Sequence, residues 1–479
     1  MSKRFAGLLW LVGQSAFAAE LSPEEAVKLA LQYDPALAAA GYDVDAASST
    51  AKGEEHAYGV TLGLDANGQH VSSPAVAAGT AFVGVSNSVQ GAVTARGETP
   101  VGLDVSLSLT TRYGATTSVF DPNQPAVVNG PRLTTQTRLT VVQAIGTGAG
   151  LRDGWSARDQ ARQRVDSAKV TEAQSASLVV RDTLLAWWEA AYATAALRVQ
   201  ETALATAVEE RKQESGRVDA GAKAPVVLLA LDTRVATAEE AVATARADAD
   251  ARLSELQRRI GVAELPEVTL VVAPTPPPPS ADVAAMAVES APSVAVQREA
   301  VELAKITAST AGDALEPSLA VTGWLQLDSL RDVPTDAAVS VKDAVSGFVG
   351  LSGTLAVDRT RHSMAVSQAA LAVQAAEQRL ADAERTVAAD VRSALIADAS
   401  ARTRVDLAAR TLEIAQRQVE AERSRVAAGS GLQLEVRQAE DDARSAELRL
   451  LRARVDLVSA TLRLQHLTGE LVRVAAEGG

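Results

Sequence analysis

Arg217-Val218-Asp219-Ala220-Gly221 recurs 208 residues later as Arg425-Val426-Ala427-Ala428-Gly429, and these two segments decide how the chain is interpreted. The same offset relates Gly261 to Gly469. Similarity at a fixed offset indicates one structural unit that is present twice. Each copy of the motif ends in glycine, which adopts a left-handed backbone at a helix end without steric cost. We therefore expect two tandem repeats, each with a helix that ends at this motif.

The two repeats are expected to contain the same order of elements. Each begins with a helix, continues with segments of alternating apolar residues, and ends with a very long helix followed by a shorter one. In the first repeat, residues 19–273, the expected bounds are 22–57, 59–143, 151–217 and 226–260. In the second repeat, residues 280–479, they are 280–314, 318–357, 358–425 and 434–468. The proline-rich segment 274–279 is expected to be a stiff linker between the repeats.

The first repeat is the longer of the two. Asp34-Pro35 corresponds to Ala291-Pro292 at an offset of 257, whereas the later motif has an offset of 208. The difference of 49 residues lies in the first repeat and includes strand-like segments at 82–95 and 101–113. We therefore expect an enlarged strand region there.

Residues 1–18 have the features of a secretory signal peptide. Lys3 and Arg4 form a basic start, an apolar segment follows at 5–13, and Ala16-Phe17-Ala18 fits the small-residue pattern of a cleavage site. This apolar segment is too short to span a membrane as a helix. No later segment has about 18 uninterrupted apolar residues, so the mature chain is expected to be either soluble outside the cytoplasm or held in a membrane by β-strands.

Composition disfavours several classes of function. The chain has no Cys and only 4 His, which are scattered, so we expect no metal site, no cofactor and no catalytic residue. Its net charge of −13 disfavours nucleic acid as a partner. Hydrophobic residues make up 47% of the chain but aromatic residues only 3%, which favours long helices packed through small side chains.

Apolar residues recur every seven positions in the long helices, as at Val366, Val373, Leu380 and Val387. This spacing predicts left-handed supercoiling against neighbouring helices. Two adjacent apolar stripes in 434–468 suit a helix with a neighbour on each side, as in the wall of a tube. An ordinary antiparallel bundle with a wide apolar face has the same periodicity, so both arrangements stay open.

The segments between the helices alternate with a period of two. Leu and Val at the odd positions of 101–109 alternate with small or polar residues, and 319–327 and 345–357 show the same pattern. An uncharged apolar face opposite a small polar face is typical of a membrane β-barrel with a wet interior, although a half-buried soluble sheet alternates in the same way. The candidate aromatic residues for the membrane interface are Tyr113, Trp324 and Phe348.

The segment 21–37, Leu-Ser-Pro-Glu-Glu-Ala-Val-Lys-Leu-Ala-Leu-Gln-Tyr-Asp-Pro-Ala-Leu, resembles the opening helix of the TolC-like outer-membrane efflux proteins. Leu315-Glu-Pro-Ser-Leu319 and the two Arg-Val-x-Ala-Gly motifs also resemble that family. The resemblance implies a mixed α and β fold in which a homotrimer shares one outer-membrane β-barrel, with four or more strands per subunit, and a periplasmic tunnel of coiled-coil helices. It implies a passive exit duct of a drug efflux pump or type I secretion system, with outer-membrane lipid, a periplasmic adaptor and an inner-membrane transporter as partners.

The resemblance also implies where functional residues lie. The turns at Gly221-Ala222 and Gly429-Ser430 are expected to dock the adaptor at the periplasmic tips. Glu435 occupies the position of an acidic residue of the family's aperture, so three copies are expected to form a ring that attracts cations. The other interpretation of Glu435 is a cap for the first turn of the helix 434–468.

The closing contacts of the family are not reproduced here. The companion acidic positions hold Val227 and Gln438, and the latch positions hold Val426 and Gly431. Any gate must therefore use other residues. Charged residues near the second turn are most simply interpreted as a solvated helix face: Arg423, Arg425, Glu440, Asp441 and Asp442. Trp155, Trp187 and Trp188 are expected to pack between helices.

Two other functions compete with that of an exit duct. A soluble periplasmic coiled-coil adaptor or scaffold would explain the signal peptide and the heptads but not the strand regions in both halves. An extracytoplasmic enzyme is disfavoured because no Ser-His-Asp arrangement, metal-ligand cluster or phosphate-binding Gly loop is present. The sequence does not identify the cargo.

Overall fold

The computed structural model describes residues 21–56, 58–77, 80–99, 101–119, 125, 127–145, 153–262, 279, 283–313, 318–332, 341–354 and 360–478. The expected signal peptide, 1–18, and residues 274–278 of the expected linker lie outside the described residues. The chain forms two compact units. The sheet unit comprises 43–168 and 297–380, and the helical unit comprises 1–42, 169–296 and 381–479.

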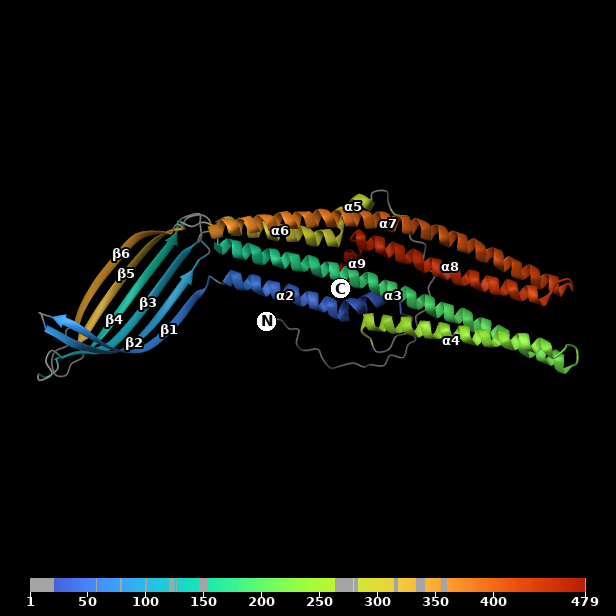
Figure 1. Ribbon diagram of the computed structural model, residues 1–479, viewed down its shortest axis with the longest axis horizontal. Coiled ribbons are helices and arrows are strands. Elements are labelled where there is room, and N and C mark those ends of the chain that lie inside the picture. Colours follow the sequence, from blue (N-terminus) through green and yellow to red (C-terminus); the bar gives the residue numbers. More distant parts are fainter. Residues whose placement is uncertain are drawn as a thin grey trace. The chain divides into compact units, whose positions relative to one another are not determined.

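The sheet unit contains a six-stranded antiparallel sheet (Figure 1). Its strands follow one another in chain order, each paired with the next. They are β1 (Val60–Ala77), β2 (Thr80–Glu98), β3 (Leu103–Val119), β4 (Val127–Ala144), β5 (Ser318–Asp332) and β6 (Val341–Thr354). Six strands agree with the expectation of four or more strands per subunit. The first repeat supplies four strands and the second supplies two, so the additional 49 residues form two extra strands.

The expected opening helices are each divided in two, which corrects the sequence interpretation. The segment 22–57 forms α1 (Pro23–Tyr33) and α2 (Pro35–His56), and the segment 280–314 forms α5 (Val283–Ser290) and α6 (Pro292–Asp313). In both cases the second helix begins at a proline, which lacks the N–H that a helix interior needs. Asp34 Oδ1 accepts hydrogen bonds from the N–H groups of Ala36 and Leu37, and thereby starts α2.

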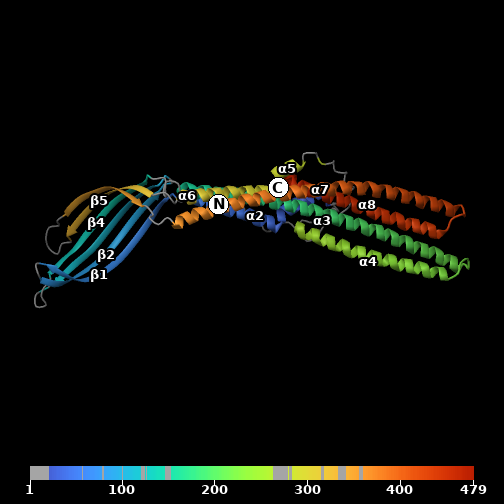
Figure 2. The same cartoon turned by 45° about the horizontal axis from the view of Figure 1, so that its top comes forward.

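The helical unit contains two antiparallel helical hairpins, and the first parts of their long helices, 153–168 and 360–380, belong to the sheet unit (Figures 1 and 2). The first consists of α3 (Asp153–Asp219) and α4 (Val226–Ile260), and the second of α7 (Thr360–Ala427) and α8 (Gln433–Leu467). These bounds differ from the expected ones by a few residues at most. A short helix that was not expected, α9 (Glu470–Gly478), follows α8. No helix in the described part of the chain is both long enough and apolar enough to cross a membrane.

The same joint between a long hairpin and a short helix occurs twice. Gly261, which ends α4 with φ +75°, lies so close to Tyr33 of α1 that an added Cβ would be 3.1 Å from its Cβ. Gly469, after α8 with φ +73°, lies against Ser290 of α5, and an added Cβ would be 2.6 Å from the Ser290 carbonyl oxygen. Glycine is needed at both positions for its backbone conformation and for the close approach. The recurrence supports the proposal of two repeats.

The core of the helical unit is built mainly from small side chains. Trp187 is fully buried, donates its indole N–H to the carbonyl oxygen of Leu21 at 2.9 Å, and meets the Trp188 ring edge-on at 4.8 Å. The expected packing role of these two residues is therefore confirmed, whereas the side chain of Trp155 lies outside those described. Around them Ala190 and Ala191 are also fully buried, and such small side chains allow the helices to approach closely.

Candidate functional site

One face of the sheet is apolar and exposed. The register places Leu64, Val93, Leu109, Leu327 and Val345 in one row across the strands, interrupted only by a threonine of β4. Directly opposite residues of antiparallel strands point to the same side, so these side chains share one face. Leu64 is 79% exposed and Val345 is 68% exposed. A continuous apolar surface of this extent indicates contact with lipid or with another apolar surface.

The other face is polar and connected by hydrogen bonds. Its next row contains Thr94, Ser108, Arg138, Gln326 and Ser346. Amide and guanidinium groups on this face bond across the strands, as in Gln136 Nε2 to Asp328 Oδ1 at 3.1 Å and Arg112 Nη2 to Ser88 Oγ at 2.9 Å. The sheet thus separates an apolar surface from a polar one, as the alternation predicts.

The expected interfacial aromatic residues do not share a face, which corrects the sequence interpretation. Tyr113 lies on the apolar face, opposite Leu133 of β4. Trp324 and Phe348 lie opposite each other on the polar face, because Trp324 pairs with Thr140 and alternates with Leu325 on the other face. Only Tyr113 of the three therefore remains a candidate for the membrane interface.

The first tip, residues 217–225, closes the hairpin of α3 and α4. Gly221 has φ +74°; its N–H donates to the Val218 carbonyl at 2.8 Å, and the Ala222 N–H donates to the Arg217 carbonyl at 2.8 Å. These two bonds and the left-handed glycine define a Schellman motif, which satisfies the last carbonyl groups of α3.

The second tip, residues 425–432, repeats this motif between α7 and α8. Gly429 has φ +77°, its N–H donates to Val426 at 3.0 Å, and the Ser430 N–H donates to Arg425 at 2.9 Å. The repeated Arg-Val-x-Ala-Gly sequence therefore encodes the same turn twice. The expected left-handed glycines are confirmed at both tips, and docking of an adaptor at Gly221, Ala222, Gly429 and Ser430 stays a proposal.

A buried carboxylate stabilises the first tip. Glu214, only 5% exposed, lies 2.7 Å from Lys223 Nζ and 2.7 Å from Arg217 Nη1. The hydrogen bond from Lys223 and the two positive charges lower the pKa of Glu214, although burial opposes this shift. The sequence analysis missed Lys223. Its partner lies on the other side of the turn, so only the folded turn brings the two together.

Glu435 contacts its own helix end. Its Oε2 accepts a hydrogen bond from the backbone N–H of Leu432 at 3.3 Å, just before α8, and lies 3.8 Å from Arg425 Nη1. A glutamate that receives the N–H of the capping residue is half of a capping box. This contact supports the capping interpretation, while the ring of three carboxylates stays a proposal.

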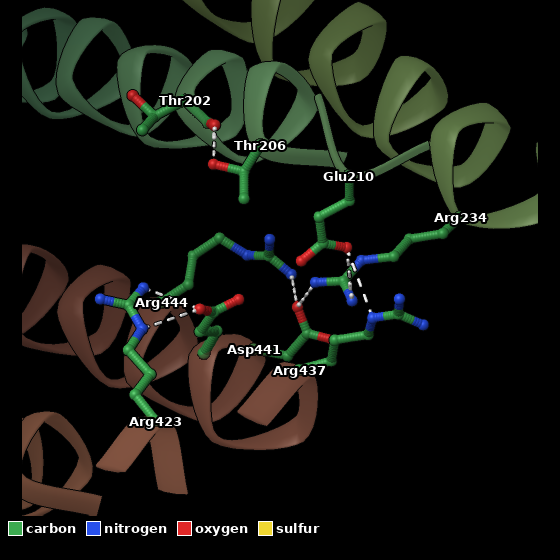
Figure 3. A network of polar contacts seen from close by, with 9 residues as sticks. Thr202, Thr206, Glu210, Arg234, Arg423, Arg437, Asp441 and Arg444 are labelled. Carbon is green, nitrogen blue, oxygen red and sulfur yellow. Dashed lines mark hydrogen bonds and ion pairs between the residues drawn. The ribbon is translucent and has the colours of Figure 1, made fainter. Parts of the chain in front are cut away.

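A network of charged residues joins the two hairpins a few helical turns before the tips (Figure 3). Glu210 of α3 lies between Arg234 of α4, at 3.8 Å, and Arg437 of α8, at 3.4 Å. Arg234 also reaches Asp441 of α8 at 3.3 Å, and Asp441 is bound by Arg444 at 2.8 Å. The contacts of Arg437 with Glu210 and of Arg234 with Asp441 therefore connect the first hairpin with the second.

This network changes the interpretation of the charged residues near the second turn. Asp441 bridges the hairpins rather than serving only as a solvated residue. Arg423 and Glu440, by contrast, form an ion pair of 2.7 Å within the second hairpin. Glu210, Arg234 and Arg437 were missed, because a charged residue on a helix looks the same in sequence whether it faces water or a neighbouring helix.

A cavity of about 1210 Å³ adjoins the network in the helical unit. Residues of α3, α7 and α8 line it, among them Arg198, Arg423, Arg444 and Arg454. Among the described residues, no group of three or more His, Asp or Glu side chains is arranged to hold a metal ion.

Residues 283–470 match the family of outer membrane efflux proteins, which confirms the resemblance inferred from the sequence. Over more than nine-tenths of its length the chain also has the fold of solved outer-membrane channels. CusC, described as undergoing conformational changes during folding and transmembrane channel formation, matches with a TM-score of 0.67 and 13% identity, over 96% of this chain and 95% of its own.

Two further solved structures are similar. The CmeC outer membrane channel of Campylobacter jejuni has a TM-score of 0.65 and 13% identity, covering 96% of this chain and 90% of its own. The outer membrane protein VceC of Vibrio cholerae has a TM-score of 0.63 and 14% identity, covering 93% of this chain and 96% of its own. No curated protein sequence matches the chain.

Proposed function

We propose that the protein is an outer-membrane channel that serves as the passive, non-enzymatic exit duct of a tripartite efflux pump or type I secretion system. The observation that carries this proposal is the six-stranded sheet, which exposes leucine and valine on one face and hydrogen-bonded polar groups on the other. The match of residues 283–470 to outer membrane efflux proteins supports the same function. The apolar face would contact outer-membrane lipid, and the polar face would line the passage.

Closure of the sheet requires further copies of the chain. Among the described residues, strands β1 and β6 each have a neighbour on one side only, and an unpaired strand edge is strongly unfavourable in lipid. Pairing of β6 of one copy with β1 of the next removes both edges. Three copies, the number that the family resemblance implies, would form a closed barrel of eighteen strands, whereas four strands per chain would give twelve.

The helical unit would lie in the periplasm and meet an adaptor and an inner-membrane transporter. The two tips are compact, hydrogen-bonded turns; Val226, which follows the first tip, and Leu432, at the end of the second, are 66% and 64% exposed. Exposed apolar residues on ordered turns are suitable for docking another protein. We place the docking surface at Gly221, Ala222, Gly429 and Ser430.

The network around Glu210 is proposed as the gate contact in place of the missing latch residues. Separation of the hairpins would break the contacts of Arg234 with Asp441 and of Arg437 with Glu210. A half-buried carboxylate between two guanidinium groups is costly to leave unpaired, so the network favours the closed arrangement.

The alternative of a soluble periplasmic adaptor gains no support from the comparisons. It also leaves the exposed apolar face of the sheet unexplained. The two functions differ in where the protein resides, which makes cell fractionation a direct test: an exit duct stays with the outer membrane after washing at high salt, and a soluble adaptor does not.

Strand pairing between copies can be tested by disulfide formation. Because the chain has no native Cys, Leu64→Cys in β1 can be combined in turn with a Cys at each odd position of 345–351 in β6. We expect oxidation of at least one pair to give covalent trimers, since a disulfide forms only when the two Cα atoms lie within about 7 Å. Each single variant is the matched control. Monomers alone, from every pair, would contradict the proposed architecture.

A further inference from the structure

A pair of aromatic side chains lies on the polar face of the sheet, where water is expected. Trp324 of β5 and Phe348 of β6 are directly opposite, with ring centroids 6.0 Å apart and planes inclined by 20°. Their neighbours along the two strands on this face are Gln326, Asp328 and Ser346. Phe348 is 50% exposed, so an apolar ring surface is open within a hydrated surrounding.

An arginine lies against the same indole ring. The guanidinium carbon of Arg138, on β4, is 4.3 Å from the centroid of Trp324, which is the geometry of a cation–π contact. Arg138 Nε is buried without a hydrogen-bond partner, and none of the ion pairs among the described residues includes this side chain. Its positive charge is therefore held on the ring but not neutralised.

The carboxylate on this part of the face is already occupied. Asp328 Oδ1 accepts from Gln136 Nε2 at 3.1 Å, and Asp328 Oδ2 accepts from Gln326 Nε2 at 2.7 Å. Both oxygens of Asp328 thus bind neutral amides, which leaves the charge of Arg138 available to a negatively charged group from solution.

A glycine makes room for the open ring. A Cβ added at Gly350 would lie 2.4 Å from Phe348 Cζ, so the phenyl ring rests over the backbone of its own strand. Any larger residue at position 350 would displace the ring. The cation, the indole and the phenyl ring therefore form a continuous surface across β4, β5 and β6.

We propose that Arg138, Trp324 and Phe348 form a binding site for organic anions that carry an aromatic ring, such as aromatic sulfonates and carboxylates. The ring of the solute packs against the Trp324 and Phe348 rings, and its acidic group meets the guanidinium of Arg138, which lies against Trp324. The proposal rests on the proposed function, because the polar face must line the passage for solutes in transit to reach it. It names a class of cargo that the wall of the passage favours.

The test uses the full-length protein in lipid nanodiscs and isothermal titration calorimetry, with empty nanodiscs subtracted. The probe is 2-naphthalenesulfonate, compared with methanesulfonate, which has the charge alone, and 2-naphthalenemethanol, which has the ring alone. We expect the probe to bind about tenfold more tightly than either, and Arg138→Gln and Trp324→Leu to weaken it about tenfold.

Two further variants make the test specific. Arg112→Gln removes an equal charge from the same face, where Arg112 bonds Ser88, and should bind the probe as the wild type does. Gly350→Ala keeps all three side chains and every charge but displaces Phe348, and should weaken binding of the probe severalfold. It also serves as the test if Arg138→Gln fails to fold.

Equal affinity of the wild type and Gly350→Ala for the probe, or an equal loss in Arg112→Gln and Arg138→Gln, would overturn the site. Conductance of the wild type in planar bilayers is measured separately. If the protein conducts but does not bind the probe, the proposed function stands and the proposed binding site is refuted. A protein that binds the probe but does not conduct keeps the binding site and refutes the proposed function.

Discussion

Arg234 of α4 and Asp441 of α8 form an ion pair, with Nη2 and Oδ1 3.3 Å apart, that joins residues 207 positions apart in the chain. The pair links the first hairpin to the second, and Arg234 also contacts Glu210 within its own hairpin. A second ion pair in the same region, between Arg211 and Asp232, lies entirely within the first hairpin. The two arginines therefore differ in what they hold together.

Replacement of Arg234 should favour the open channel. Arg234→Gln removes one link between the hairpins, and a loss of about 1 kcal/mol of stabilisation shifts the ratio of closed to open forms about fivefold. We expect larger and more frequent openings in planar bilayers. Arg211→Gln is the matched control and should conduct as the wild type does. Equal conductance of the wild type and Arg234→Gln would remove the network from the gate.

Bulky residues at the tip glycines should abolish export and leave the assembly intact. Gly221 and Gly429 have φ +74° and +77°, and open space surrounds both Cα atoms. Gly221→Leu and Gly429→Leu therefore add strain of about 1 kcal/mol to the turn without a clash elsewhere. Gly216→Leu, in the last turn of α3 and equally open, is the control because this glycine does not have a left-handed backbone. Export assays and native mass measurement check this; normal export from a tip variant would sink the docking proposal.

Glu435→Gln separates the two roles of this residue. Glutamine still accepts the Leu432 N–H through its side-chain carbonyl, so the helix end should persist. If three carboxylates line the aperture, the loss of charge should weaken cation selectivity and block by divalent ions in single-channel recordings. Selectivity and block identical to those of the wild type would leave only the capping role.

The helical unit should lose stability as the pH falls below about 6.5. Ser177 is fully buried, and its Oγ lies 2.8 Å from His466 Nδ1. Burial, and then the charge of Arg181, lower the pKa of His466, while Asp182 opposes this shift. The folded protein therefore binds this proton less readily than the unfolded chain, so the free energy of unfolding decreases as the pH falls through the unfolded value.

His466→Gln should reduce this dependence. The thermal midpoint, followed by circular dichroism between pH 7 and pH 5, should fall less in the variant than in the wild type. His56→Gln, at an exposed position of α2, is the control and should follow the wild type. A wild type whose midpoint does not change over this range would refute the role of His466.

Local signals in the sequence were sufficient for the turns and for the first cap. Ser22 and Glu25 form a capping box around the first turn of α1, which begins at Pro23, with bonds of 3.2 and 3.1 Å. The signal for the break at Asp34-Pro35 was also present, because proline at a first helical position follows a capping residue. The alternation likewise places Trp324 on the same face as Gln326 and on the opposite face from Leu325. The position of Trp324 on the polar face of the sheet could therefore have been predicted from the sequence.

Long-range packing was not accessible in this way. The contact between Glu210 and Arg437 depends on which side of α8 faces α3, and 227 positions separate the two residues. Periodicity gives the apolar stripe of a helix but not the partner that covers it. The family resemblance supplied the arrangement of the elements and a minimum of four strands per subunit, and the six strands observed agree with that expectation.

The two additional strands bear on the size of what can leave the cell. Strands about 4.8 Å apart and tilted by about 40° give an eighteen-stranded ring a backbone diameter of about 36 Å, against about 24 Å for twelve strands. The cross-section that the backbone encloses is therefore more than twice as large in an eighteen-stranded barrel as in a twelve-stranded one. In a trimer of this protein the outer opening would then admit large solutes. The tips of the helical hairpins, rather than the barrel, would limit the size of the solutes that pass.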